Sequence, residues 1–304
     1  MLRLISDDTS IKFIKLKLFS FSFSILFSIV ALLAVLFIGL NFGIDFKGGI
    51  LLEVRTSNNI GISDLRDEIT NLNIGEVSIQ EFGADTDYLI RVERQKGSDE
   101  AQQIAVEVIK SSLNKAFSND IKYRRLEYVG PTVSKDLVSD GVMAIIFAII
   151  AMLAYIWFRF ELPFALGAIV ALLHDIVLTM GVFAVLGLEF NLATVAAILL
   201  IIGYSMNDTV VVYDRIRENL RKFKKMNLND LLDKSINETL SRTINTTVTT
   251  ILALGALYLI GGQIIADFAF AMLWGIIVGT YSSIFIASTI LVYLNVRRTK
   301  EKES

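Results

Sequence analysis

Six stretches of this sequence are long and apolar enough to cross a lipid bilayer, and they constrain the fold more than any other feature. The hydrocarbon core is about 30 Å thick, so a spanning helix needs about 20 apolar residues. The predicted spans are residues 19–40, 140–158, 162–188, 190–214, 244–266 and 268–296. A soluble chain of 304 residues would interrupt such runs with charges, so we predict a polytopic α-helical membrane protein. No small-residue cleavage site follows the first run, which is therefore predicted to be a retained anchor.

Lysine and arginine indicate which way the spans run. The basic segments are an N-terminal arm (1–18), Arg159, a connection (215–243) and a tail (297–304), whereas the connections around Glu189 and 261–267 have no lysine or arginine. A six-span chain places all four basic segments on one side. The positive-inside rule then predicts a multi-pass membrane protein with both termini in the cytoplasm. The connection 215–243 has the pattern of an amphipathic helix. Two roles are about equally favoured, a surface helix attracted to membrane lipids and a docking segment.

One long segment, residues 41–139, lies between the first two spans and is predicted to be periplasmic. Its pattern predicts strands at 50–55, 76–82, 88–93 and 121–128, and helices at 63–71 and 98–117. Ser63 is the expected N-cap of the first helix. Ile104, Val108 and Leu113 are expected on the buried face of the second. The order strand–helix–strand–strand–helix–strand predicts a small α+β domain of the ferredoxin-like kind.

Several chemistries are excluded by what the sequence lacks. There is no cysteine, which rules out disulfides and thiol nucleophiles, and there is one histidine. The sequence contains no Gly-Lys pair and therefore no Walker A loop. We expect no enzyme activity, no cofactor and no nucleic-acid partner. Work done by this protein would then draw on an ion gradient or on a partner.

Ionisable side chains inside the spans are the candidate functional residues, because an acid in hydrocarbon costs about 2.5–3.5 kcal/mol by insertion scales. Asp208 follows Asn207 within the fourth span. It could bind an ion, or it could simply hydrogen-bond neighbouring helices, and position alone favours neither. In the third span, Asp175 is the second candidate, either as part of a proton relay with Asp208 or as a structural group. Its neighbour His174 points about 100° away on a helix.

The start of the fifth span offers a polar counterpart to Asp208. Arg242 heads a stripe of hydroxyl side chains at helical spacing, made of Thr239, Thr243, Thr246, Thr247 and Thr250. Threonines in membrane helices usually serve packing, but a continuous stripe facing a buried acid favours a polar path. Arg242 is the expected partner or gate of Asp208. In the sixth span, Ala271, Gly275, Gly279 and the pair 282–283 form a small-residue ridge that permits close helix contact.

Several motifs resemble those of the SecF family, in the same order and over nearly the whole chain. They are G-I-D-F-K-G-G at 43–49, V-G-P at 129–131, the long motif at 203–219 from Gly203 to Asn219, S-R-T at 241–243 and G-T-Y-S-S-I at 279–284. The resemblance implies a place in the resistance-nodulation-division superfamily, whose members use proton or sodium gradients. It also implies a protein-export function in late, ATP-independent steps of translocation.

The resemblance further implies partners and site residues. The partners would be SecD, the SecYEG channel and the translocating preprotein, with YajC and SecA as additional candidates. Asp208 and Arg242 carry over as ion-coupling residues, and we add Asn207, Asp175 and Thr246 to that set. Asp45, Gly48 and Gly49 would form the joint between the first span and the external domain, where glycine tolerates unusual backbone angles. Two rival interpretations are a half-transporter for lipids or small molecules and a purely structural subunit.

Overall fold

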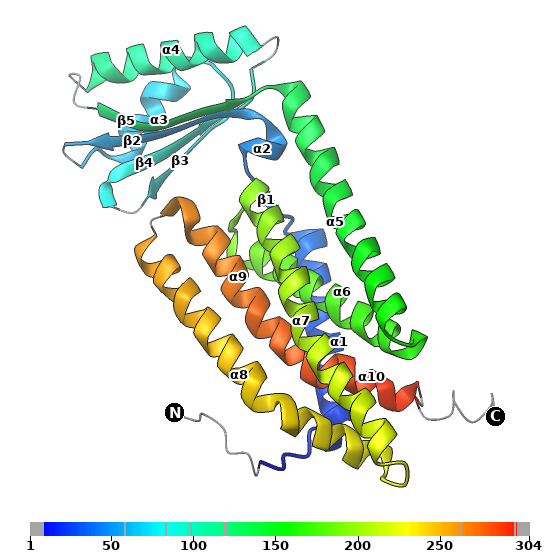
Figure 1. Cartoon of the computed structure of the whole chain (residues 1–304). Helices are drawn as coiled ribbons and strands as arrows, with labels where there is room; N and C mark the ends of the chain where they lie inside the picture. Colours follow the sequence, from blue (N-terminus) through cyan, green and yellow to red (C-terminus); the bar gives the residue numbers. More distant parts are fainter. Residues whose placement is uncertain are drawn as a thin grey trace. The chain divides into compact units, whose positions relative to one another are not determined.

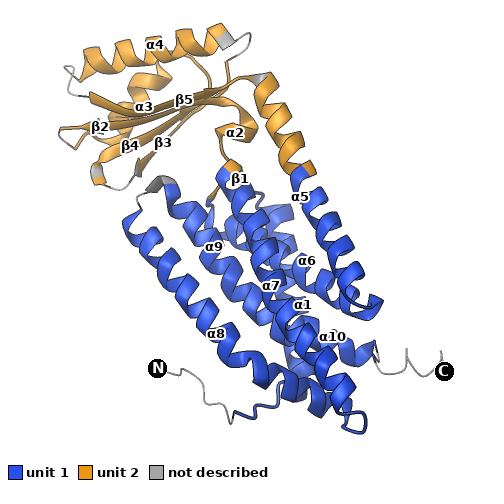
Figure 2. Cartoon of the chain, viewed as in Figure 1, with its two compact units in different colours: residues 1–41, 144–188, 193–304 blue, residues 42–143, 189–192 orange. Residues whose placement is uncertain are grey.

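The computed structural model describes residues 9–57, 59–82, 84–95, 97, 99–117, 121–261, 263–294 and 296. Arg3 of the N-terminal arm and the basic tail at 297–304 lie outside these residues. The chain divides into two compact units (Figure 2). One contains residues 1–41, 144–188 and 193–304 and is helical; the other contains 42–143 and 189–192 and is an α/β unit.

The α/β unit is built on a four-stranded antiparallel sheet. Its elements are β2 (Gly49–Thr56), α3 (Ile62–Thr70), β3 (Val77–Phe82), β4 (Ala84–Val92), α4 (Asp99–Ala116) and β5 (Ile121–Val129). The strand order is β3-β4-β2-β5. Sequence order and strand order together are those of a ferredoxin-like unit, as predicted. A register shift between Glu53 and Val54 interrupts the β2–β5 pairing.

Both helices of this unit cover the same face of the sheet (Figure 1). The core between them contains Ile50, Leu52 and Ile90 from the strands and Ile109 and Leu113 from α4, all with their side chains fully or almost fully buried. Alternation along the strands produces this face, because successive side chains point to opposite sides of a sheet.

Two details of the predicted helices were wrong. Ile104 and Val108 are 65% and 40% exposed, and the buried face of α4 instead runs through Ala105, Val106, Ile109 and Leu113. Leu113 was placed correctly, but its neighbours one and two turns earlier are at positions 109 and 106 rather than at 108 and 104. The N-cap of α3 is Gly61 and not Ser63, which lies in the first turn.

Short elements complete the α/β unit. β1 (Asn41–Phe42) pairs with β6 (Glu189–Phe190), and α2 (Ile44–Lys47) follows β1. The rings of Phe42, Phe46 and Phe190 pack together, with centroids 5.8–6.0 Å apart. Residues 189–192, the connection between the third and fourth spans, therefore belong to the α/β unit, which the sequence did not indicate.

Within the described residues, six helices are long and apolar enough to span a membrane. They are α1 (Lys17–Phe37), α5 (Pro131–Arg159), α6 (Leu162–Leu186), α7 (Leu192–Lys222), α8 (Leu228–Ile260) and α9 (Gln263–Ser282); α9 continues through a π-helical turn (Ser283–Ala287) into α10 (Ser288–Tyr293). The predicted connection 215–243 is not a separate helix. Instead α7 extends to Lys222, α8 begins at Leu228, and only a short turn separates them. Residues 263–266, assigned by sequence to the fifth span, belong to α9.

Small residues set the helix spacing in the helical unit. A methyl group added at Gly279 of α9 would lie 2.9 Å from the Cβ of Ser205 on α7, and one added at Gly181 of α6 would lie 2.7 Å from the Cα of Ala31 on α1. Gly275 likewise packs directly against Ile201. The predicted ridge on α9 thus contacts α7, as small residues allow helix backbones to approach closely.

Candidate functional site

Asp208 lies where α7, α8 and α9 meet. Its side chain is 3% exposed. It is hydrogen-bonded to Thr280 of α9, whose hydroxyl lies 2.9 Å from the hydroxyl of Thr247 on α8. The second carboxylate oxygen, Oδ2, is buried and has no hydrogen-bond partner among the described residues. A buried carboxylate oxygen without a donor is costly, and such oxygens in native structures call for an explanation.

Arg242, on α8, is exposed and is the cation whose charge acts on Asp208. No direct ion pair joins the two side chains. Asn207 precedes Asp208 but is exposed, because neighbouring residues on a helix point about 100° apart. Arg242 is therefore near enough to interact electrostatically without closing on the acid, and Asn207 faces away from it.

The hydroxyl stripe on α8 divides into two sets. Thr243 and Thr247 are buried toward the other helices, and the hydroxyl of Thr243 has no partner within the described chain. Thr246 is half-buried and donates to carbonyls of its own helix, those of Arg242 (3.1 Å) and Thr243 (2.9 Å). Thr247, through Thr280, is thus the threonine that connects to Asp208, whereas Thr246 remains in contact with its own backbone.

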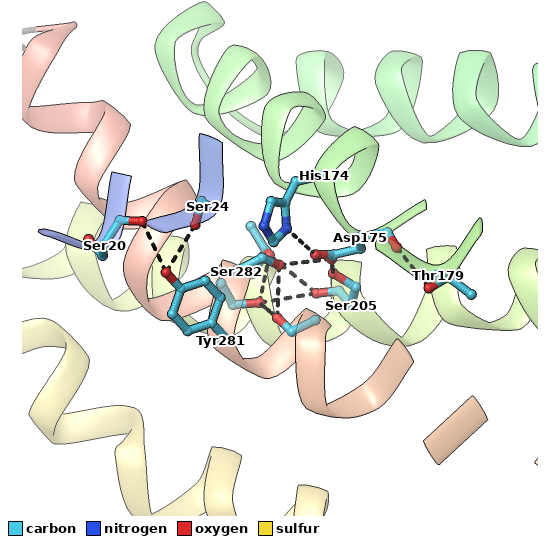
Figure 3. Close-up of polar contacts among 11 residues, drawn as sticks. Ser20, Ser24, His174, Asp175, Thr179, Ser205, Tyr281 and Ser282 are labelled. Carbon is cyan, nitrogen blue, oxygen red and sulfur yellow. Dashed lines mark hydrogen bonds and ion pairs between the residues drawn. The ribbon is translucent and has the colours of Figure 1, made fainter. Parts of the chain in front are cut away.

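Asp175 of α6 forms a second buried site (Figure 3). Its side chain is fully buried, and Oδ2 accepts hydrogen bonds from Ser205 of α7 (2.6 Å) and Ser282 of α9 (2.8 Å). His174 Nδ1 lies 3.0 Å from Oδ1. In the described part of the chain, Asp175 has no contact with lysine or arginine. Its charge is balanced only by hydroxyl groups and by the single histidine.

His174 connects this site to α1. Its ring lies beside Tyr281, with centroids 6.1 Å apart, and the hydroxyl of Tyr281 lies 2.9 Å from that of Ser24 (Figure 3). The other ring nitrogen, Nε2, is buried and has no partner within the described residues. His174 also lines a largely apolar recess of about 330 Å³ between α1 and α6. As expected, His174 and Asp175 do not share a partner; they bond to each other.

The two carboxylates are not in direct contact, and the hydrogen bonds from Asp175 lead to the residue after Asp208 rather than to Asp208 itself. Ser205 bonds Asp175 through its side chain, and its carbonyl accepts from Thr209, the residue after Asp208. Thr209 in turn lies 3.0 Å from the hydroxyl of Ser283, the first residue of the π-helical turn. Such turns frequently mark functional sites in helices.

The predicted joint residues come together in the α/β unit. Asp45 Oδ2 accepts a hydrogen bond of 2.9 Å from the backbone N–H of Leu192, the first residue of α7. Gly48 and Gly49 have φ angles of +72° and +127°. A Cβ at Gly49 would lie 2.6 Å from the carbonyl oxygen of Val92 on β4, so glycine is required there for both angle and space.

Sequence reasoning missed several members of these sites. Ser205, Ser282 and Thr280 were not singled out as partners of the two acids. Ser205 is one turn before Asp208, which was a usable signal. Ser282 was noted only as part of the small-residue ridge, and Thr280 only within the motif at 279–284. The ion pair between Arg91 and Glu189 inside the α/β unit was also missed, because 98 residues separate the partners.

Among the described residues, no group of three or more histidine or acidic side chains is arranged to hold a metal ion. The buried polar groups are instead isolated carboxylates with hydroxyl neighbours.

The sequence matches known protein families and individual relatives. A model described as "Protein export membrane protein SecD/SecF, C-terminal" matches residues 108–297, and a "SecD/SecF GG Motif" model matches residues 34–60. The chain is 45% identical over 301 residues to the protein translocase subunit SecF of Rickettsia felis, covering 99% of this chain and 97% of that protein. It is 47% identical over 267 residues to that of Magnetococcus marinus, covering 88% and 86%.

Solved structures agree. The crystal structure of SecDF from Thermus thermophilus, described as a translocon-associated membrane protein, matches with a TM-score of 0.85 and 34% identity over 97% of this chain. A SecDF structure in a super-membrane-facing form matches with a TM-score of 0.71 and 32% identity over the whole chain. This chain spans 40% and 41% of those longer chains. The chain therefore belongs to the SecD/SecF family of protein-export membrane proteins, as a protein translocase subunit of the SecF type.

Proposed function

We propose that this subunit uses a proton or sodium gradient across the bacterial inner membrane to promote late, ATP-independent steps of protein export. The observation that carries the proposal is Asp208, a carboxylate buried within a membrane-spanning helix with one oxygen bonded and the other unpartnered. A group placed only to hold helices together would be expected to use both oxygens.

The geometry supports reversible ion binding at Asp208. An ionised carboxylate in this position is costly, and binding a proton or a sodium ion would remove that cost. Arg242 interacts electrostatically with Asp208 without forming a closed ion pair, which leaves the carboxylate free to bind and release an ion. Loading and release would therefore change the charge at the junction of α7, α8 and α9, where Thr280 and Thr247 transmit the change between helices.

Asp175 is proposed as a second proton-binding group in the same pathway. Its carboxylate is linked to α7 and α9 by Ser205 and Ser282, the same two helices that surround Asp208. The carbonyl of Ser205 also accepts a hydrogen bond from Thr209, the residue after Asp208. A proton at Asp175 would change how strongly α6 is held to α7 and α9.

SecD is the proposed partner, and the surface of α7 and α8 supports this. Asn207, Arg242, Asn245 and Thr249 are exposed in this chain although they belong to membrane-spanning helices. Polar side chains in a bilayer face protein or water rather than lipid. The proposed assembly includes SecYEG, YajC, SecA and the preprotein, with both termini of this chain in the cytoplasm and the α/β unit in the periplasm.

The test is gradient-driven completion of a stalled preprotein in inverted vesicles without ATP. We expect Asp208→Asn to insert and to assemble with SecD but not to complete transport. Asp214→Asn is the matched control, because Asp214 is in the same helix but is half-exposed and paired with Arg159. Full activity of Asp208→Asn would refute the coupling role and favour a structural subunit.

A separate experiment tests the partner. The chain has no cysteine, so a single cysteine at Asn245 can be crosslinked without background. We expect crosslinking of Asn245→Cys to SecD, and none from Leu259→Cys, which is 81% exposed near the other end of the same helix and has no polar neighbours requiring a partner. Crosslinking from Leu259→Cys alone would place the interface elsewhere.

A further inference from the structure

A basic recess lies where α5 ends and the last turns of α7 pass it. Its lining residues are Arg159, Asp214, Arg217, Glu218, Arg221 and Lys222, around a volume of about 400 Å³. Four of the six are cationic. This recess has no part in the ion-coupling site, and the proposed function does not explain it.

The two acids in the recess are already engaged. Asp214 accepts two hydrogen bonds from Arg159 Nη2, at 2.8 and 2.9 Å. Glu218 accepts one of 2.7 Å from Arg215, which lies outside the recess. Within the described chain, Arg217, Arg221 and Lys222 have no carboxylate partner. The recess therefore presents three uncompensated cations.

The backbone helps to hold this arrangement. Arg217 donates to the carbonyl oxygen of Arg159 (3.3 Å), which ties the end of α5 to α7. The guanidinium group of Arg159 lies over the ring of Phe160, 5.1 Å from its centroid. The cations thus come from two helices whose positions are fixed by these contacts, and not from a single flexible run of lysines.

Exposed aromatic residues indicate the level in the membrane at which the recess lies. Trp157 and Phe158, directly before Arg159, are 69% and 95% exposed, and Leu162, three residues after it, is 59% exposed. Aromatic side chains at the end of an apolar span mark the boundary between hydrocarbon and headgroups. The recess therefore opens at the level where the phosphates of phospholipids lie, next to an apolar surface suited to acyl chains.

We propose that this recess binds the phosphate headgroup of an anionic phospholipid, with the acyl chains along Trp157, Phe158 and Leu162. Basic pockets between membrane helices are a known mode of anionic-lipid recognition. Arginine suits phosphate because its planar guanidinium group donates two parallel hydrogen bonds. The adjacent apolar surface favours a lipid over free phosphate.

The test is native mass spectrometry of the purified full chain, released from mixed micelles that contain phosphatidylglycerol and phosphatidylethanolamine in equal amounts. We expect phosphatidylglycerol to be retained. Arg217→Gln/Arg221→Gln should weaken that retention by about thirty-fold, taking about 1 kcal/mol for each basic residue. Lys224→Gln/Lys225→Gln is the matched control, because it removes the same charge from the next turn and should change retention by less than about three-fold.

Further variants and competing ligands distinguish a lipid site from diffuse surface charge, a phosphate site and a peptide site. Arg217→Lys/Arg221→Lys, which keeps the charge, should retain most of the lipid, and the melting temperature of each variant shows whether the fold is intact. Equal losses in the two glutamine double variants would overturn the site in favour of diffuse surface charge. Displacement of the lipid by millimolar inorganic phosphate would overturn the lipid assignment. Binding of a polyglutamate peptide but not of phosphatidylglycerol would overturn it in favour of an acidic protein segment.

Discussion

The stability of the fold should depend on the two buried acids to different extents when the charge of each is removed by substitution with asparagine. Asp175 accepts from the hydroxyl groups of Ser205 (2.6 Å) and Ser282 (2.8 Å) and lies 3.0 Å from Nδ1 of His174. Asp208 has one described hydroxyl partner and one buried oxygen with none. Asp175 therefore stabilises the fold through its bonds, whereas Asp208 is retained at a cost.

The magnitudes follow from these contacts. Hydrogen bonds to a charged group are worth about 1.5–3 kcal/mol each. An asparagine at position 175 keeps one acceptor oxygen, but its NH₂ group faces a side chain that donated to the lost oxygen. We expect Asp175→Asn to lose about 2–4 kcal/mol. At position 208, removing a buried charge is favourable, whereas adding a buried amide N–H without a partner is unfavourable. These two contributions roughly cancel, so Asp208→Asn should change stability by no more than about 1 kcal/mol.

Thermal unfolding in one detergent, followed by the fluorescence of the two tryptophans, measures the difference. A loss of about 2 kcal/mol corresponds to a fall in melting temperature of roughly 4–8 °C for a chain of this size. Asp175→Asn should show at least that fall, and Asp208→Asn should melt within about 3 °C of the wild type while failing in gradient-driven export. If Asp208→Asn melts as low as Asp175→Asn, the reasoning that Asp175 stabilises the fold while Asp208 is retained at a cost is refuted.

Three further predictions concern other parts of the chain. The guanidinium group of Arg55 lowers the pKa of Asp87 in the folded state, so Asp87 stabilises the α/β unit at neutral pH and this contribution is lost as the pH falls through the lowered pKa. The difference in unfolding free energy between wild type and Asp87→Asn should therefore shrink from pH 7 to pH 3. A difference that does not change with pH would contradict the ion pair. Gly49→Ala should destabilise by more than about 2 kcal/mol in thermal unfolding, whereas Gly39→Ala, also at positive φ but in open space, should cost about 1 kcal/mol. In ¹⁵N NMR the only histidine, His174, should be the Nδ1–H tautomer, because the carboxylate of Asp175 accepts a hydrogen bond there. Asp175→Asn should increase the population of the Nε2–H tautomer. An Nε2–H tautomer in the wild type would refute a hydrogen bond from Nδ1 to Asp175.

The membrane-spanning architecture was predictable because it follows from local physics. Uninterrupted apolar runs and their basic flanks depend only on neighbouring residues, and all six spans are helices in the structure. The order of the α/β elements was also readable from period-2 and period-3.6 patterns. The errors in α4 arose because a half-polar helix offers two nearly equivalent stripes, and only packing against the sheet selects Ala105 and Ile109 over Ile104 and Val108.

The candidate site was only partly predictable, because its partners come from distant positions. Asp208 and Asp175 stood out as acids in apolar spans, which is a local signal. That Asp175 bonds Ser282, 107 residues away, depends on the packing of α6 against α9. Nor could helical periodicity decide whether Thr246 or Thr247 faces Asp208, since adjacent positions on a broad polar stripe differ only in which neighbour they meet.

The hydrogen bond from Leu192 to Asp45 has a consequence for how the start of α7 opens. Helices are usually capped by the residue just before them, but here the acceptor lies 147 positions earlier in the chain. This bond joins the first N–H of α7 to the turn at residues 44–47, so opening at Leu192 breaks a contact with that turn. Amide exchange at Leu192 would therefore follow opening of that turn, and a faster exchange in Asp45→Ala would identify one backbone proton as a reporter on the α/β unit.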